Sequence, residues 1–135
     1  MEILPGAREH LLGSNWNENG FEENPEIKIQ VRGLTKVSEK GVSILNNVSV
    51  DIPKGIIMGV IGPSGSGKST FLRSLNRLWE PSSNSVFLDG HDICDLDVLA
   101  LRRKIGMLFQ LPVLFEGTVA DNVRYGPQLK GKKTK

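Results

Sequence analysis

The sequence predicts a mixed α/β fold in one domain, and three observations support this prediction. Residues 55–61 form an apolar, β-branched run that is typical of a buried parallel strand. A glycine-rich loop follows this run directly, at residues 62–70. Beyond the loop, apolar residues recur at the spacing of one helix face, at Phe71, Leu72, Leu75, Leu78 and Trp79. A chain of 135 residues is long enough to bury one hydrophobic core.

Two strands are predicted before the loop. Residues 1–25 are rich in Asn, Glu and Gly without sustained periodicity, and we expect them to form a flexible leader. From residue 26 onward apolar and polar residues alternate, which predicts half-buried strands at 27–31 and 44–52. The second strand ends at the turn Pro53-Lys54-Gly55.

Further elements are predicted after the loop helix, which closes at Glu80-Pro81. They are a short strand, a short helix, a second apolar strand and one or two helical turns, at 85–88, 95–103, 105–110 and 118–124. The pair Asp89-Gly90 is a turn signal that ends the first of these strands. Antiparallel strands on both sides of the loop depart from a simple alternating parallel sheet.

Composition argues against several classes of function. Seventeen basic and fifteen acidic residues give a net charge of +2, which is too small to indicate a nucleic-acid partner. The lone cysteine, Cys94, rules out an internal disulfide and a cysteine metal cluster. Apolar runs of only about six residues fall far below the roughly 20 needed to cross a bilayer, and no secretory signal or transit peptide is evident. The basic residues 127–135 are expected to form a disordered tail.

The loop satisfies the pattern Gly-x-x-x-x-Gly-Lys-Ser/Thr without a mismatch, which predicts a nucleotide site in a P-loop NTPase-like fold. Its glycines let the backbone turn tightly and aim successive N–H groups at phosphate oxygens. Lys68 is expected to reach the β and γ phosphates of a nucleotide, and Ser69 to offer a hydroxyl ligand to Mg²⁺. The start of the following helix adds partial positive charge. The predicted binding residues are Gly62, Pro63, Ser64, Gly65, Ser66, Gly67, Lys68, Ser69 and Thr70.

From about Ile27 to Gly126 the chain resembles the N-terminal half of an ATP-binding cassette (ABC) transporter ATPase, in five segments that follow the family's order. Residues 44–55 are similar to the paired strand before the family's Walker A loop, and residues 62–70 are similar to that loop. Residues 86–93 resemble the strand and turn between the two nucleotide motifs, and residues 101–110 resemble the approach to the Q-loop glutamine. Residues 114–123 are similar to the segment that faces the membrane subunit. The resemblance implies a truncated ABC ATPase core with an antiparallel β subdomain. Residues 26–126 would then be the N-terminal half of a nucleotide-binding domain.

The resemblance also implies a function. The chain would be an ATP-binding subunit, or a fragment of one, that uses ATP and Mg²⁺ to energise transport through a separate transmembrane subunit. The lack of a fused transmembrane region, together with residues 71–78, resembles separate-subunit ATPases such as bacterial phosphate-import proteins and the plant I family. Such a subunit would be cytoplasmic, peripheral at the cytoplasmic face of a membrane, and would have a second ABC ATPase as dimer partner.

Position within the family motif assigns a role to Gln110. This glutamine would coordinate Mg²⁺ together with Ser69 and would sense the γ-phosphate or the attacking water. Lys68 and Gln110 are therefore the candidate catalytic residues, and Ser69 and Gln110 the candidate metal ligands. Phosphoryl transfer asks the protein mainly for positioning and charge stabilisation, which a lysine, a metal and an amide can supply. The alternative for Gln110 is an ordinary amide at the end of a strand.

Three parts of the family's catalytic machinery have no counterpart in this sequence: the signature helix, the Walker B strand with its catalytic glutamate, and the switch histidine. Residues 85–89 resemble Walker B, but Gly90 stands where the glutamate is expected, which favours a turn. Neither His10 nor His91 matches the switch position. We therefore expect hydrolysis by this chain alone to be absent or very slow.

Two further departures concern binding and stability. The family stacks adenine on an aromatic residue upstream of the loop, and residues 34–38 contain none, so we expect base binding to be weaker by about 1 to 2 kcal/mol. Residues 55–61 would have unpaired backbone edges, because the strands that flank them in the family are not encoded here. We expect such a piece to be marginally stable, and we therefore interpret the chain as a truncated gene product or the product of an alternative transcript.

Three other interpretations compete with the leading one. A glycine-serine linker would account for the loop composition, but a linker would not lie between a buried strand and an amphipathic helix. A small kinase would share the loop, but it would need an acidic or arginine-rich lid, which the sequence does not show. A non-hydrolysing fragment would bind the membrane subunit or a full-length paralogue and block it.

Overall fold

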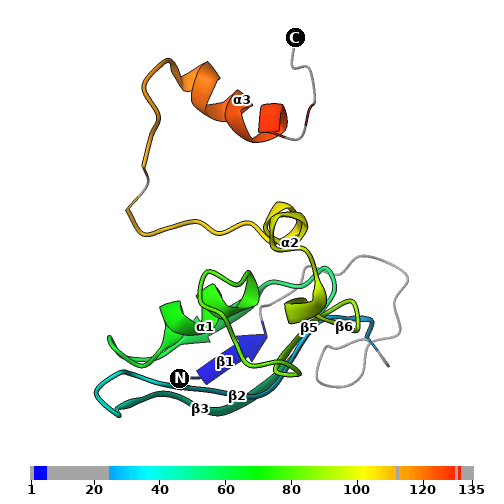
Figure 1. Cartoon of the computed structure of the whole chain (residues 1–135), viewed down its shortest axis with the longest axis vertical. Helices are drawn as coiled ribbons and strands as arrows, with labels where there is room; N and C mark the ends of the chain where they lie inside the picture. The colour runs from blue at the N-terminus through cyan, green and yellow to red at the C-terminus, as the bar shows by residue number, and fades with distance from the viewer. Residues whose placement is uncertain (1, 6–24, 112, 130, 132–135) are drawn as a thin grey trace.

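The computed structural model describes residues 2–5, 25–111, 113–129 and 131, and these residues form two sheets and several helices (Figure 1). Most of the flexible leader predicted at 1–25 lies outside the described residues, and so does most of the basic tail predicted at 127–135. The disorder expected of both ends therefore stays a prediction.

The larger sheet is antiparallel throughout, with the strand order β3-β2-β5-β6. β2 and β3 are its long strands (Ile27–Val37 and Ser43–Pro53), whereas β5 and β6 are short (Val86–Leu88 and His91–Asp92). Side chains alternate between the two faces of a strand, so the alternating apolar residues of the long pair give this sheet one apolar face. The strands predicted at 27–31, 44–52 and 85–88 are confirmed.

The strand that leads into the glycine-rich loop belongs to a second, two-stranded sheet. β4 (Met58–Ile61) pairs antiparallel with β1 (Glu2–Pro5), and Ile61 stands opposite Glu2 in the register. The predicted parallel strand at 55–61 is therefore wrong in its pairing direction and too long. An apolar run indicates that a strand is buried, but the direction of pairing depends on which segment reaches its edge. One edge of β4 is covered by β1, and the other has no partner strand among the described residues.

Helix α1 (Lys68–Leu75) lies over the apolar face of the larger sheet (Figure 1). The 3₁₀ turn η1 (Ile93–Asp95) and helix α2 (Val98–Lys104) each add one buried residue to the same core. Burying a large apolar side chain contributes roughly 1.5 to 3 kcal/mol, so this single core holds the loop helix on the sheet. Its members are Val31, Leu34, Leu45, Phe71, Leu75, Val86, Leu88, Ile93 and Leu101.

Residues 105–111 and 113–118 form no regular structure, so the apolar strand predicted at 105–110 is wrong. Leu108 and Val113 in this segment are 92% and 86% exposed. A strand needs a neighbour for its backbone hydrogen bonds, and none of the described strands pairs with this segment. Helix α3 (Val119–Leu129) follows, contains the predicted helical turns, and buries none of its residues. Figure 1 shows α3 well separated from both sheets.

Candidate nucleotide site

The glycine-rich loop joins the end of β4 to the start of α1, and its glycines set its path. The backbone angle φ is +151° at Gly62, +80° at Gly65 and +91° at Gly67, a region that other residues rarely adopt. Gly67 carries a second constraint, because a Cβ atom there would lie 2.6 Å from the carbonyl oxygen of Ile44 on β3. A Cβ atom at Gly65 would meet nothing within 4 Å. The loop is therefore backed by β3 at Gly67 and open at Gly65.

Lys68 folds back over the first residues of the loop. Its ammonium nitrogen Nζ donates to the carbonyl oxygen of Gly62 at 2.7 Å and to that of Pro63 at 2.8 Å. These acceptors are neutral, and an ammonium group bonds more strongly to an ionised oxygen than to a neutral carbonyl. Phosphate oxygens that enter the loop can therefore replace the two carbonyls as partners of Lys68.

The start of α1 carries backbone donors that the helix itself does not use. Gly67 is the N-cap and supplies no side-chain cap, and the first turn holds no acidic residue. The first N–H groups of a helix have no acceptor within it, and the helix dipole is positive at this end. The hydroxyl oxygen of Ser66 is buried and has no hydrogen-bond partner among the described residues. This arrangement fits a ligand with several anionic oxygens.

The remaining predicted loop residues lie where an approaching ligand can reach them. Pro63, Ser64 and Ser69 are exposed, and Thr70 is half-buried. The exposed hydroxyl of Ser69 is a hard oxygen donor of the kind that Mg²⁺ accepts. The nine predicted binding residues thus comprise the loop before α1 and the first three residues of that helix.

Gln110 is not joined to the loop by any hydrogen bond within the part of the chain that the structure describes. Its side chain is exposed in the irregular segment 105–111. The motif fixes the place of Gln110 in the sequence, but its distance from Lys68 depends on how residues 105–110 pair. Because that segment is unpaired here, the catalytic and metal-binding roles of Gln110 stay predictions.

Carboxylates take structural roles in the described residues and do not contact the loop. Asp92 accepts hydrogen bonds from the backbone N–H groups of Asn84 and Cys94, which closes the turn at η1. Burial raises the pKa of Asp92, but these two N–H donors, the Cys94 thiol and the charge of Arg77 together outweigh burial, so the pKa is lowered overall. No group of three or more His, Cys, Asp and Glu side chains that could hold a metal occurs in the described ranges. The loop therefore offers N–H donors and Lys68 rather than a carboxylate cage.

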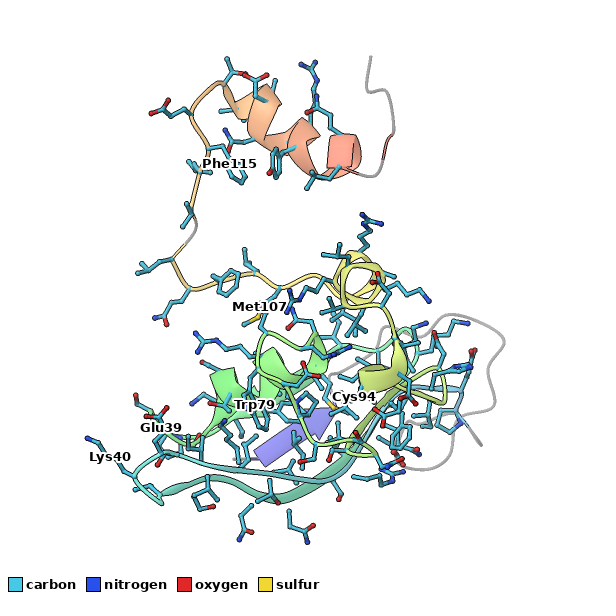
Figure 2. The ribbon with its side chains drawn as sticks, viewed as in Figure 1. Glu39, Lys40, Trp79, Cys94, Met107 and Phe115 are labelled. Atoms are coloured by element: carbon cyan, nitrogen blue, oxygen red, sulfur yellow. The ribbon has the colours of Figure 1, made fainter. Side chains whose placement is uncertain are left out.

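No pattern in the sequence predicts two of the contacts near the loop. The Ile44 carbonyl that backs Gly67 comes from a strand well before the loop. The Nζ atom of Lys36 on β2 lies 4.7 Å from the ring centre of Trp79, which follows α1 and is labelled in Figure 2. A cation over an aromatic face is attracted by the ring electrons. Both contacts join residues that are distant in sequence, so only the folded chain reveals them.

Comparison with known proteins identifies relatives along most of the chain. A family model described as ABC transporter matches residues 45–135. Protein STAR1 of Oryza sativa subsp. japonica is 65% identical over 129 residues, which cover 94% of this chain and 37% of STAR1. ABC transporter I family member 17 of Arabidopsis thaliana is 71% identical over 126 residues, which cover 93% of this chain and 46% of that protein. The chain thus spans less than half the length of these two curated relatives.

Solved structures share the fold. A bacterial Atm1-family ABC exporter, solved with ATP bound, superposes with a TM-score of 0.65 and 29% identity over 74% of this chain and 18% of the exporter. CbiO1 from Clostridium perfringens, part of the ABC transporter complex CbiONQ, gives a TM-score of 0.64 and 29% identity over 76% of this chain and 43% of CbiO1. The predicted mixed α/β ABC ATPase fold and the resemblance to the plant I family are confirmed. None of the helices in the described ranges is both long and apolar enough to cross a membrane.

Proposed function

We propose, since the chain belongs to the ABC transporter family, that its loop binds the triphosphate of ATP with Mg²⁺ as part of a transporter's ATP-binding subunit. One observation carries the proposal: Lys68 and the uncapped start of α1 converge on a loop that β3 holds in place at Gly67. The Lys68 ammonium group and the N–H donors at the start of α1 therefore lie around the same part of the loop.

Each residue of the loop has a distinct task in this proposal. Backbone N–H groups between Gly65 and Ser69 bind the phosphate oxygens, and the helix start favours their negative charge. Lys68 leaves the carbonyl oxygens of Gly62 and Pro63 and pairs with the outer phosphates. Ser69 offers its hydroxyl as a metal ligand. Mg²⁺, when bound, would neutralise part of the charge on the phosphates.

Titration calorimetry with ATP in the presence of Mg²⁺ tests this site. Wild-type protein should bind one equivalent, and Lys68→Ala should lose at least tenfold in affinity, because it removes the only side-chain cation of the loop. Lys104→Ala is the matched control, since it removes an exposed lysine at the end of α2. Equal affinities for wild type and Lys68→Ala would refute the site.

Catalysis by this chain alone is a separate question. We expect phosphate release from ATP to be absent or very slow, because no described carboxylate contacts the loop to act as general base. The role proposed for Gln110 predicts that Gln110→Ala weakens Mg-ATP binding relative to ATP without metal. Transfer of phosphate to an added acceptor would instead support a kinase.

The exposed apolar residues beyond α2 favour a protein partner. Leu108, Leu111, Val113 and Leu114 are all largely exposed, and α3 buries no residue. We propose that this region contacts a separate transmembrane subunit at the cytoplasmic face of a membrane, in an assembly with a second ABC ATPase. A non-hydrolysing chain that occupies such a subunit or a paralogue is the alternative that the same surface supports.

Co-purification distinguishes the transporter ATP-binding subunit from the non-hydrolysing chain. The chain should be recovered with detergent-solubilised membrane subunit, and Leu111→Asp should reduce the recovery, with Leu99→Asp on α2 as control. Recovery without ATPase activity would support the non-hydrolysing version. Failure to recover either a membrane subunit or a paralogue would remove both.

A further inference from the structure

A cavity of about 630 Å³ lies between one end of the larger sheet and the end of α2. Its wall is formed by the start of β2, by the end of β5 with the turn after it, and by residues 104–106. The residues of this wall and those of the phosphate loop (62–70) do not overlap. Cavities that hold small molecules in proteins commonly measure about 300 to 1,000 Å³. The size of this cavity is therefore that of a small-molecule site.

The floor of the cavity is apolar and belongs to the hydrophobic core. Leu88 is a buried core member, and Ile29 and Ile105 pack against that core. Ile29 also stands opposite Leu88 in the register of the β2–β5 pair. Strand pairing therefore holds this floor in place, and an apolar ligand would find its binding surface already formed.

The rim of the cavity is charged. The Nζ atom of Lys28 lies 2.7 Å and 2.9 Å from the two carboxylate oxygens of Asp89. Lys104, the last residue of α2, is exposed at the same rim. The hydrogen bond from Lys28 lowers the pKa of Asp89 against the opposing effect of burial, and the charges of Lys28 and Lys104 lower it further. Two cations and one anion leave this rim with an excess of one positive charge.

The backbone fixes the position of Asp89 on the rim. Asp89 and Gly90 connect β5 to β6, with φ of +51° and +78°. A two-residue hairpin turn of type I′ needs positive φ at both positions, which favours Asp or Asn before Gly. The N–H of Asp89 also donates to the carbonyl oxygen of Lys28 at 3.0 Å. The Asp89 carboxylate therefore stays beside Lys28, and an Asn at this position should keep the same turn.

We propose that the cavity binds a small monoanion with an apolar body, of the class of medium-chain carboxylic acids. The hydrocarbon chain would lie on the apolar floor, where it is removed from water. Lys104 would pair with the ligand carboxylate, because Lys28 already has an anionic partner in Asp89. An excess of one positive charge favours a monoanion over a phosphate group with two charges. The proposal does not depend on nucleotide binding at the phosphate loop.

Titration of the whole ¹⁵N-labelled chain with octanoate tests the proposal. The backbone amide signals of residues 28–29, 88–89 and 104–106 should shift. 1-Octanol, which has the chain but no charge, should bind about two- to fivefold more weakly, the value of one partly exposed ion pair. Acetate, which has the charge but no chain, should cause no shift at the same concentration. Shifts confined to α3 and the exposed apolar residues before it, or equal binding of octanoate and 1-octanol, would overturn the proposal.

Two substitutions on the rim should change the affinity for octanoate in opposite directions. Lys104→Ala should weaken octanoate to the level of 1-octanol. Asp89→Asn should strengthen octanoate binding by about two- to fivefold, because it keeps the turn and frees Lys28 to pair with the ligand. Such a gain cannot come from a damaged fold. Lys40→Ala, at the exposed tip of the β2–β3 hairpin, is the control and should change neither ligand. Unchanged octanoate affinity in Lys104→Ala, or no gain in Asp89→Asn, would contradict the proposal.

The same protein samples separate this proposal from the proposed function. Lys104→Ala should bind Mg-ATP as the wild type does, and Lys68→Ala should bind octanoate as the wild type does, because the two sites share no residue. Wild-type protein that binds octanoate but not ATP would refute the proposed function alone. Wild-type protein that binds ATP but not octanoate would refute the second site alone.

Discussion

The Cα of Gly67 is turned toward the carbonyl oxygen of Ile44 so closely that an added Cβ atom would lie 2.6 Å from that oxygen. The position also holds a φ of +91°. The contact links the strand β3 to the start of α1, so the phosphate loop depends on a strand that lies well before it in the sequence. Glycine is required here both for backbone conformation and for space.

Gly67→Ala should destabilise the fold more than Gly65→Ala does. Both positions have positive φ, which costs an L-residue about 1 to 2 kcal/mol, but only Gly67 also meets backbone atoms. Urea unfolding of the two variants measures the difference in the free energy of unfolding. Equal losses for the two variants would show that the Ile44 contact does not constrain the loop.

Lys36→Gln should lower the free energy of unfolding by about 0.5 to 1 kcal/mol, the value of a partly exposed cation–π contact. The ammonium group lies 4.7 Å from the ring centre of Trp79, so its removal should also alter tryptophan fluorescence. Lys40→Gln, at the exposed hairpin tip, is the control and should change neither quantity. An effect of Lys40→Gln as large as that of Lys36→Gln would assign the change to net charge instead.

Asp92 should make stability depend on pH. Its pKa is lowered in the folded state, because burial, which raises it, is outweighed by the N–H bonds from Asn84 and Cys94 together with the Cys94 thiol and the charge of Arg77. A carboxylate with a lowered folded pKa stabilises the fold above its unfolded pKa of about 3.9, and this contribution is lost as pH falls through the folded pKa.

The measurement for Asp92 is chemical unfolding of wild type and Asp92→Ala between pH 7 and pH 3. The variant should be about 1 to 3 kcal/mol less stable at neutral pH, because two partly buried N–H groups lose their charged acceptor, and the gap should narrow below about pH 4. Asp95→Ala removes an exposed carboxylate nearby and should show a smaller gap. A gap that stays constant with pH would contradict the lowered pKa.

Asn122→Ala should loosen the start of α3. The Asn122 side chain accepts the N–H of Phe115 at 2.9 Å and donates to the carbonyl oxygens of Phe115 and Thr118, both at 3.0 Å. Hydrogen exchange of the Phe115 amide should therefore accelerate in this variant, while Gln128→Ala, near the end of the helix, should leave it unchanged. Unchanged exchange in Asn122→Ala would show that the turn is held by other contacts.

The parts of the fold that were predictable from the sequence depend on local pattern. Alternation along β2 and β3 predicts both strands, and the helical spacing after Gly67 predicts where α1 begins. The predicted end of this helix at Glu80-Pro81 is wrong, because α1 ends at Leu75. Residues 105–110 have an equally apolar pattern but form no strand, because pairing needs a second edge that local sequence does not specify. For the same reason, the antiparallel partner of β4 could not be foreseen.

In the candidate site, too, the features that depend on adjacent residues were predictable from the sequence, and those that depend on tertiary contacts were not. The motif that contains Lys68 gave the phosphate loop, because its chemistry comes from adjacent residues. The contact of Gly67 with the Ile44 carbonyl and the cation–π contact of Lys36 with Trp79 are tertiary contacts, so the sequence alone did not reveal them. Gln110 is the residue whose predicted role depends most on pairing that the described chain does not contain.

The most direct test of the central claim is a residue-resolved NMR titration of ¹⁵N-labelled protein with Mg-ATP. The account predicts that the backbone amide signals of residues 65–69 shift most and saturate together, since these N–H groups bind the phosphates. Saturating ATP that leaves the loop amides unchanged, or that shifts signals only elsewhere in the chain, would contradict it.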